Sequence, residues 1–165
     1  MGESVKTLEN MTEQAVEAAE GMTDIHKIMH AFQLEEQDYR MFPALTLAYI
    51  GDCIFELIIR TVVIYHSKKA VNDLHKKAIK FVKAESQALM IQGLLDEAFL
   101  TEEEIIVYKR GRNTKSHTSA KNASIAAYRK ATGFEALIGY LYVTNQMERA
   151  LEITKNGLKY VEAVL

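Results

Sequence analysis

Residues 44–65 read ALTLAYIGDCIFELIIRTVVIY, a stretch in which apolar side chains would lie on almost every side of a helix. Pro43 comes directly before it, at a position that prolines favour at the start of helices. A helix that is apolar nearly all round is typical of the interior of a domain. The stretch therefore predicts a central, mostly buried helix, in which Cys53 is a small buried apolar residue.

Three charges interrupt this helix, and their spacing leaves one of them unpaired. Asp52, Glu56 and Arg60 follow one another at intervals of four residues, which places them on one stripe of the helix. Arg60 can neutralise Glu56, so Asp52 has no cation on its own helix. Glu135 is also a single acid, in the apolar stretch 132–145 (TGFEALIGYLYVTN). Burying an unpaired carboxylate costs several kcal/mol.

Two interpretations of these acids stay open. If the two helices cross there, Asp52 and Glu135 could share a divalent metal, and oxygen ligands of this kind suit Mg²⁺. Alternatively, both are structural acids that accept hydrogen bonds from the backbone or from tyrosine. Gly51 precedes Asp52, and Gly139 follows Glu135 by one turn. Glycine inside a helix is tolerated where another helix approaches closely, so the pair favours a crossing at the acids.

Composition predicts an all-α domain of about seven helices. The chain has 165 residues, of which 48% are hydrophobic and 25% charged, and it contains only eight glycines and one proline. So few turn-forming residues argue against a sheet protein. Thr101 and Glu104 form a capping box at the start of one helix. Further helices are expected near residues 5–20, 23–32, 71–95, 101–109, 132–145 and 147–164, with helical patterning resuming near residue 123.

Several classes of protein are excluded by what the sequence lacks. The single cysteine cannot form an internal disulfide or a four-cysteine zinc site, which favours the reducing cytosol. No run approaches the roughly 18 apolar residues of a membrane-spanning helix, and we expect no membrane association. There is no phosphate-binding GxxxxGK[ST] loop, no GxGxxG motif and no Ser-His-Asp order, which removes the common nucleotide-binding and acyl-transfer classes.

The charge is divided unevenly along the chain. Residues 1–38 carry nine acidic residues and two lysines, whereas the remainder carries 18 basic and 13 acidic residues. We therefore expect an acidic leader over residues 1–38, as a marginal helix or a mobile arm, and a domain over residues 39–165. Residues 105–134 contain no acid, and their polar part from residue 110 predicts a loop that either contacts phosphates, with Gly111 allowing close approach, or is simply solvated.

Three segments together resemble the ribonuclease III family. Residues 48–56 (AYIGDCIFE) resemble its signature helix, and residues 134–140 (FEALIGY) resemble its second motif. The basic segment KRGRN at residues 109–113, with Lys115 and Ser116, is similar to that of the small bacterial branch, Mini-ribonuclease III, which lacks a double-stranded-RNA-binding domain. The resemblance covers roughly residues 40–160. It departs from full-length ribonuclease III where Leu45, Ala48 and Thr132 replace acids, as they do in the branch.

The resemblance implies a homodimeric, cytoplasmic endoribonuclease with the ribonuclease III-like helical fold. It would cleave double-stranded RNA with Mg²⁺, leaving a 5′-phosphate and a 3′-hydroxyl. Asp52 and Glu135 would be the catalytic and metal-binding residues. The implied substrate is precursor 23S ribosomal RNA, with a ribosomal protein on that substrate as a further partner. The implied RNA-binding residues are Lys76, Lys77, Lys109, Arg110, Arg112, Asn113, Lys115, Ser116 and Lys121.

Two other functions remain as alternatives. The first is a catalytically inactive, dimeric RNA-binding factor for ribosome assembly with the same fold, against which the retained Asp52 and Glu135 argue. The second is a helical interaction module whose acids are structural and whose acidic leader binds a basic partner. The acid-free stretch 105–134 speaks against the second alternative.

Overall fold

The computed structural model describes residues 24–115 and 124–161, and within these ranges every regular element is a helix. The all-α prediction is therefore confirmed. Residues up to Gln37 and residues from Asp38 form two separate units. The first unit contains α2, and the predicted helix at residues 5–20 lies outside the described residues. The elements are α2 (Asp24–Ala31), η1 (Tyr39–Met41), α3 (Ala44–His66), α4 (Val71–Val82), α5 (Ala84–Asp96), α6 (Glu102–Asn113), α7 (Ile125–Val143), α8 (Met147–Gly157) and η2 (Leu158–Tyr160).

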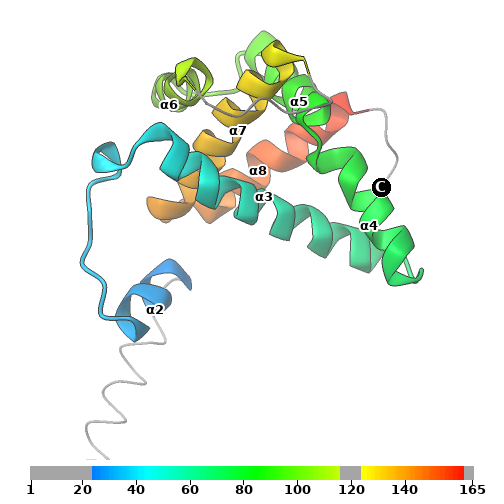
Figure 1. Ribbon diagram of the computed structural model, residues 1–165, viewed down its shortest axis with the longest axis horizontal. Helices are drawn as coiled ribbons and strands as arrows, with labels where there is room; N and C mark the ends of the chain where they lie inside the picture. Colours follow the sequence, from blue (N-terminus) through cyan, green and yellow to red (C-terminus); the bar gives the residue numbers. More distant parts are fainter. Residues whose placement is uncertain (1–23, 116–123, 162–165) are drawn as a thin grey trace, which may run out of the picture. The chain divides into compact units, whose positions relative to one another are not determined.

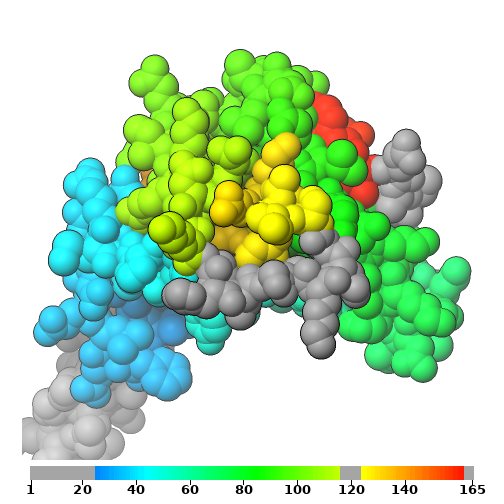
Figure 2. Space-filling view, turned by 45° about the horizontal axis from the view of Figure 1, so that its top comes forward, coloured from blue at the N-terminus to red at the C-terminus, as the bar shows by residue number. Residues whose placement is uncertain are grey.

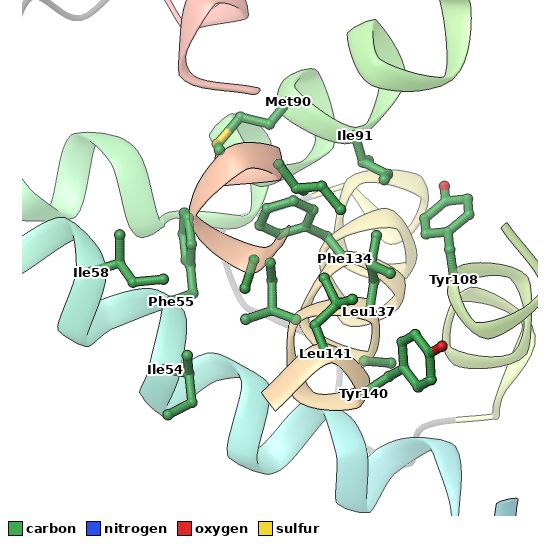
Figure 3. Packing of buried hydrophobic residues seen from close by; sticks show 14 of the residues in the cluster. Ile54, Phe55, Ile58, Met90, Ile91, Tyr108, Phe134, Leu137, Tyr140 and Leu141 are labelled. Carbon is green, nitrogen blue, oxygen red and sulfur yellow. The ribbon is translucent and has the colours of Figure 1, made fainter. Parts of the chain in front are cut away.

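Helix α7 is the centre of the second unit. It crosses α3 and also packs against α5 and α6, as Figure 1 shows. The crossing is filled by aromatic and aliphatic side chains, which Figure 3 shows from close by. Phe55 of α3 and Phe134 of α7 are both fully buried and meet edge to face, with ring centroids 5.2 Å apart. Because the two rings pack together, the residues next to them on α3 and α7 are held in fixed positions at the crossing.

Helix α3 begins after Pro43, as predicted, but it is buried on only one side. Leu47, Phe55 and Ile59 lie in the core, whereas Tyr49 and other apolar residues of the opposite side are exposed. Cys53 is exposed too, so its assignment as a buried residue was wrong. The physical reason is that the domain packs against one face of α3 only.

The predicted helix over residues 71–95 is two helices, α4 and α5, which meet at Lys83 in an extended backbone conformation. Side chains of α5 bind carbonyl groups that the break leaves without helical partners. Ser86 Oγ donates to the carbonyl of Lys80 (2.6 Å), and Gln87 Nε2 donates to that of Val82 (2.9 Å). Polar side chains therefore stabilise the break. An amphipathic pattern does not predict these hydrogen bonds, because it distinguishes only apolar from polar positions.

Helix α6 starts at the predicted capping box and continues to Asn113, four residues beyond the predicted end. Gly111 is thus a helical residue and not part of a loop. A Cβ at this position would lie 2.7 Å from the Cβ of Ala136, so Gly111 allows α6 to approach α7. The expectation that Gly111 lets the backbone approach a phosphate was wrong, because its open side is filled by α7.

The C-terminal part also differs in detail from the prediction. Residues 125–143 form one continuous helix, and α8 starts at Met147 as expected but ends at Gly157. Asn145 has φ 58°, a left-handed conformation of the kind that commonly follows the end of a helix, here α7. Among the described residues, no helix is both long and apolar enough to span a bilayer.

Candidate active site

Two glycines bring α3 and α7 into direct backbone contact. A Cβ added to Gly51 would lie 1.8 Å from the carbonyl oxygen of Glu135, and one added to Gly139 would lie 1.9 Å from that of Leu47. Atoms cannot approach so closely, so no larger residue fits at either position without moving a helix. The predicted helix crossing beside the two acids is therefore present.

This crossing places Asp52 and Glu135 close together. Asp52 follows Gly51 on α3, and Glu135 is the residue of α7 whose carbonyl faces Gly51. Burial and the charge of Asp52 raise the pKa of Glu135 from 4.5 to about 7. Two acids that are distant in the sequence thus influence one another across the crossing.

No described cation neutralises this pair. Asp52 is exposed on α3, but partial desolvation of its carboxylate, and then the charge of Glu56, raise its pKa. Arg60 forms an ion pair with Glu56 at 2.7 Å, as the spacing predicted, and within the described residues it forms no ion pair with Asp52. The arrangement holds two carboxylates together at a cost that a bound cation would offset.

Gln87 is a residue of this site that the sequence analysis missed. Its side chain is buried, and its Nε2 donates to Glu135 Oε1 at 3.1 Å. This hydrogen bond favours the ionised form of Glu135 and partly offsets the rise in its pKa. A signal was present, because Gln87 precedes the buried Met90, Ile91 and Leu94 at helical spacing. A glutamine at a core position needs polar partners.

The donor set fits a hard divalent cation. Mg²⁺ is commonly held by one or two carboxylates and keeps water or substrate phosphate as its other ligands. Asp52 and Glu135 supply two such carboxylates. Across residues 24–115 and 124–161, no group of three or more His, Cys, Asp or Glu side chains could hold a metal ion. Thr132, at a position where full-length ribonuclease III carries an acid, donates its hydroxyl to the carbonyl of Tyr128.

The structure describes seven of the nine residues expected to bind RNA. Lys109, Arg112, Asn113 and Lys115 are exposed at the C-terminal end of α6, which Figure 2 shows in yellow-green beside the start of α7. On α4, Lys76 is exposed and Lys77 is half-buried. Arg110 is half-buried and donates to the carbonyl of Phe42 at 3.0 Å. Ser116 and Lys121 lie outside the described residues.

The raised pKa of Glu135 predicts that this residue destabilises the metal-free protein at neutral and alkaline pH. Because the folded state keeps the proton up to about pH 7 and the unfolded state loses it near 4.5, stability falls as pH rises between these values. The cost is fully present above about pH 7. Glu135→Gln removes the charge, so at pH 8 in EDTA we expect it to raise the free energy of unfolding by about 2–3 kcal/mol.

Urea denaturation at pH 5 and pH 8 measures this effect, and the gain should shrink at the lower pH. The same substitution at Glu104 is the control. Burial would raise the pKa of Glu104, but hydrogen bonds from Arg149 and Thr101 hold it below its usual range. Glu104→Gln should therefore destabilise the protein. Equal free energies of unfolding of wild type and Glu135→Gln at pH 8 would contradict the energetic cost that we assign to the Glu135 carboxylate.

Comparison with known proteins shows which family shares this fold and these two motifs. A family model described as Ribonuclease III domain matches residues 45–146. A Mini-ribonuclease 3 from Clostridium tetani is 55% identical over 124 residues, which are 74% of this chain and 81% of that protein. One from Enterococcus faecalis is 47% identical over 76% of this chain and 95% of that protein. A crystal structure of a protein from Fusobacterium nucleatum is 29% identical with a TM-score of 0.66, covering 74% and 97% of the two chains. The chain therefore belongs to the ribonuclease III family of endoribonucleases, which act on double-stranded RNA, and to its Mini-ribonuclease 3 group.

Proposed function

We propose that this chain is a Mg²⁺-dependent endoribonuclease that cleaves double-stranded RNA at the α3–α7 crossing, with Asp52 and Glu135 as its catalytic and metal-binding residues. The observation that carries the proposal is the convergence of these two carboxylates without a neutralising cation among the described residues. An RNA-binding factor without catalysis would have no need for this costly pair. Residues 39–165 form the catalytic domain in this proposal, and residues 1–38 are a leader outside it.

In this mechanism the chain's own residues bind the cation and orient its carboxylate ligands. Asp52 and Glu135 would hold the cation at the scissile phosphate, and Gln87 donates a hydrogen bond to one oxygen of Glu135. A bound Mg²⁺ supplies a hydroxide at neutral pH and stabilises the charge that develops on the phosphate. Hydrolysis in this way would add water across the bond between phosphorus and the 3′ oxygen: the hydroxyl stays on phosphorus as part of a 5′-phosphate, and the proton goes to the departing oxygen, which becomes a 3′-hydroxyl.

The test is incubation of the protein with a long RNA duplex in Mg²⁺. We expect fragments that carry a 5′-phosphate, and no fragments when EDTA replaces Mg²⁺. Single-stranded RNA of the same sequence should stay intact. Binding of the duplex without cleavage in Mg²⁺ would support the alternative function as an RNA-binding assembly factor.

We further propose that the basic C-terminal end of α6 and the basic middle part of α4 hold the duplex. Cations and short polar side chains bind phosphates without reading the sequence, which suits recognition of a duplex through its backbone. The residues in this role are Lys76, Lys77, Lys109, Arg110, Arg112, Asn113 and Lys115, together with Ser116 and Lys121 beyond the described ranges. The contact of Arg110 with Phe42 gives this residue a structural part as well.

The double substitution Lys109→Ala and Arg112→Ala should weaken duplex binding and make it less dependent on salt. Each phosphate contact that is lost lowers the slope of log affinity against log salt by about one. The slope is measured by filter binding in Ca²⁺ at several salt concentrations. Lys155→Ala with Lys159→Ala removes the same charge from exposed positions at the C-terminal end and is the matched control. Equal slopes for both variants would exclude α6 as the RNA contact.

A homodimer through α3 is also part of the proposal. Its exposed side carries apolar residues at intervals of four, namely Leu45, Tyr49, Cys53 and Leu57. Tyr49 is 75% exposed and Leu57 58% exposed. Continuous apolar surface of this kind marks protein interfaces. Asp52 belongs to the same helix, so a dimer formed through this face would bring two cleavage sites together, one for each strand of the duplex.

Leu57→Asp should therefore convert the dimer to a monomer at micromolar concentration, because it places a charge in an apolar contact. Sedimentation velocity gives the mass directly. Ile106→Asp is the matched control, since Ile106 is an equally exposed apolar residue of α6 (65%). A Leu57→Asp protein with the same mass as wild type would show that this face of α3 is not the interface.

The biological substrate that we propose is precursor 23S ribosomal RNA in the bacterial cytoplasm, with a ribosomal protein bound to it. The support is the family membership and the resemblance of the two motifs. Loss of the gene should cause 23S precursors with extended ends to accumulate. Wild-type protein should restore maturation, and Asp52→Asn should not.

A further inference from the structure

Gln87 occupies the junction between the α4–α5 break and the acidic pair. It lies in the first turn of α5, four residues after Lys83, whose extended conformation ends α4. Its side chain is only 2% exposed. From this position the amide nitrogen reaches two acceptors on different elements, the carbonyl oxygen of Val82 on α4 (2.9 Å) and Oε1 of Glu135 on α7 (3.1 Å).

These two contacts determine the orientation of the amide. Both partners are acceptors, so the NH₂ group must face them, and a flipped amide would place its oxygen against two other oxygens. The remaining atom, Gln87 Oε1, is buried and has no hydrogen-bond partner within the described residues. Gln87 therefore acts on Glu135 as a donor, with its direction fixed by the backbone of α4.

The Glu135 carboxylate depends on this contact for its orientation. Within the described ranges, the side chain of Glu135 accepts its hydrogen bond from Gln87. A carboxylate that is held by one oxygen has lost much of the freedom of its last torsion, and its second oxygen remains available. Groups that orient metal ligands in this way commonly contribute 10–100-fold to metal affinity.

We propose that Gln87 is a positioning residue of the metal site: its amide, held by the carbonyl of Val82, fixes the Glu135 carboxylate in the orientation that binds the divalent cation. This inference rests on the proposed function of Asp52 and Glu135. It adds that the break between α4 and α5 has a functional role, because a continuous helix would leave no free carbonyl at Val82 to hold the amide.

The test uses Gln87→Met, which keeps the length of the side chain and removes the amide. Binding of Mn²⁺, a spectroscopic substitute for Mg²⁺, is measured by electron paramagnetic resonance on the full chain without RNA. We expect the dissociation constant to rise about tenfold. Gln92→Met is the matched control on the same helix: it removes an amide that binds Asp96 and Lys130 and does not contact Glu135, so its Mn²⁺ affinity should equal that of wild type.

A purely structural role of Gln87 would give a different result. Gln87→Met would then lower the melting temperature in EDTA but leave Mn²⁺ affinity unchanged, and that outcome would overturn the proposal. Glu135→Gln, measured alongside, separates this failure from failure of the proposed function. If Glu135→Gln also binds Mn²⁺ like wild type, the metal site itself is wrong; if it loses binding while Gln87→Met does not, only the role of Gln87 is wrong.

A second measurement does not require a variant to fold. In the wild-type protein, substoichiometric Mn²⁺ should broaden the NMR signal of the Gln87 side-chain amide, because paramagnetic broadening falls steeply with distance. The Gln92 side-chain amide serves as the internal reference and should broaden much less. Equal broadening of both amides would place the cation away from Gln87 and overturn the proposal.

Discussion

Asp52→Asn is expected to reduce cleavage of a long RNA duplex about 1,000-fold or more, with duplex binding retained. The substitution removes one of two carboxylates that hold the cation while keeping the size of the side chain. Metal ions contribute several kcal/mol to the stabilisation of a transition state, and each 1.36 kcal/mol corresponds to a factor of ten in rate. The rate is measured under single-turnover conditions in Mg²⁺, and binding is measured separately in Ca²⁺.

Asp96→Asn is the control for this experiment. It makes the same chemical change at an exposed aspartate of α5 that accepts a hydrogen bond from Gln92. Its cleavage rate should stay within about twofold of wild type, as is usual for surface substitutions away from a site. A wild-type cleavage rate for Asp52→Asn would remove this residue from the mechanism. Loss of both binding and cleavage would assign it to folding or to RNA contact.

Gly51→Ala is expected to have the largest effect on stability, a loss of about 3 kcal/mol or more in the free energy of unfolding. The new methyl group would lie 1.8 Å from the carbonyl oxygen of Glu135 and 2.6 Å from the amide nitrogen of Gly139. Both are backbone atoms that cannot rotate away, so α3 and α7 must separate. Overpacking typically costs about 1–3 kcal/mol and occasionally more, and a clash with two backbone atoms belongs to the costly cases, so the gain of up to about 1 kcal/mol in helix propensity offsets only part of it.

Gly157→Ala is the matched control, because its methyl group would meet side-chain and not backbone atoms, the flexible end of Met90 at 2.9 Å and the Cβ of Met90 at 3.1 Å, and the residue has helical dihedral angles. We expect a change within about 1 kcal/mol. Urea denaturation followed by circular dichroism measures both variants. Separation of the helices should also weaken Mn²⁺ binding in Gly51→Ala. Unchanged stability of Gly51→Ala would mean that the two helices are not in backbone contact.

The sequence alone determined the features that depend on near neighbours in the chain. The capping box of Thr101 and Glu104, the start of α3 after Pro43 and the Glu56–Arg60 pair each involve residues at most four positions apart. Such interactions form wherever the helix forms, so spacing predicts them. The glycines beside Asp52 and Glu135 also predicted the crossing, because a glycine inside a helix is typical of a place where another helix approaches closely.

Only the tertiary structure decided which distant residues contact one another and which side of each helix is covered by other helices. Gln87 could be assigned to Glu135 only once α5 and α7 were seen together, and Cys53 proved exposed because nothing in the described domain covers that face of α3. Gly111 shows the same limit, since glycine serves both loops and tight helix packing. Local patterns establish which conformation a segment prefers, but burial and partners depend on the free energy of packing between distant segments, which no single segment contains.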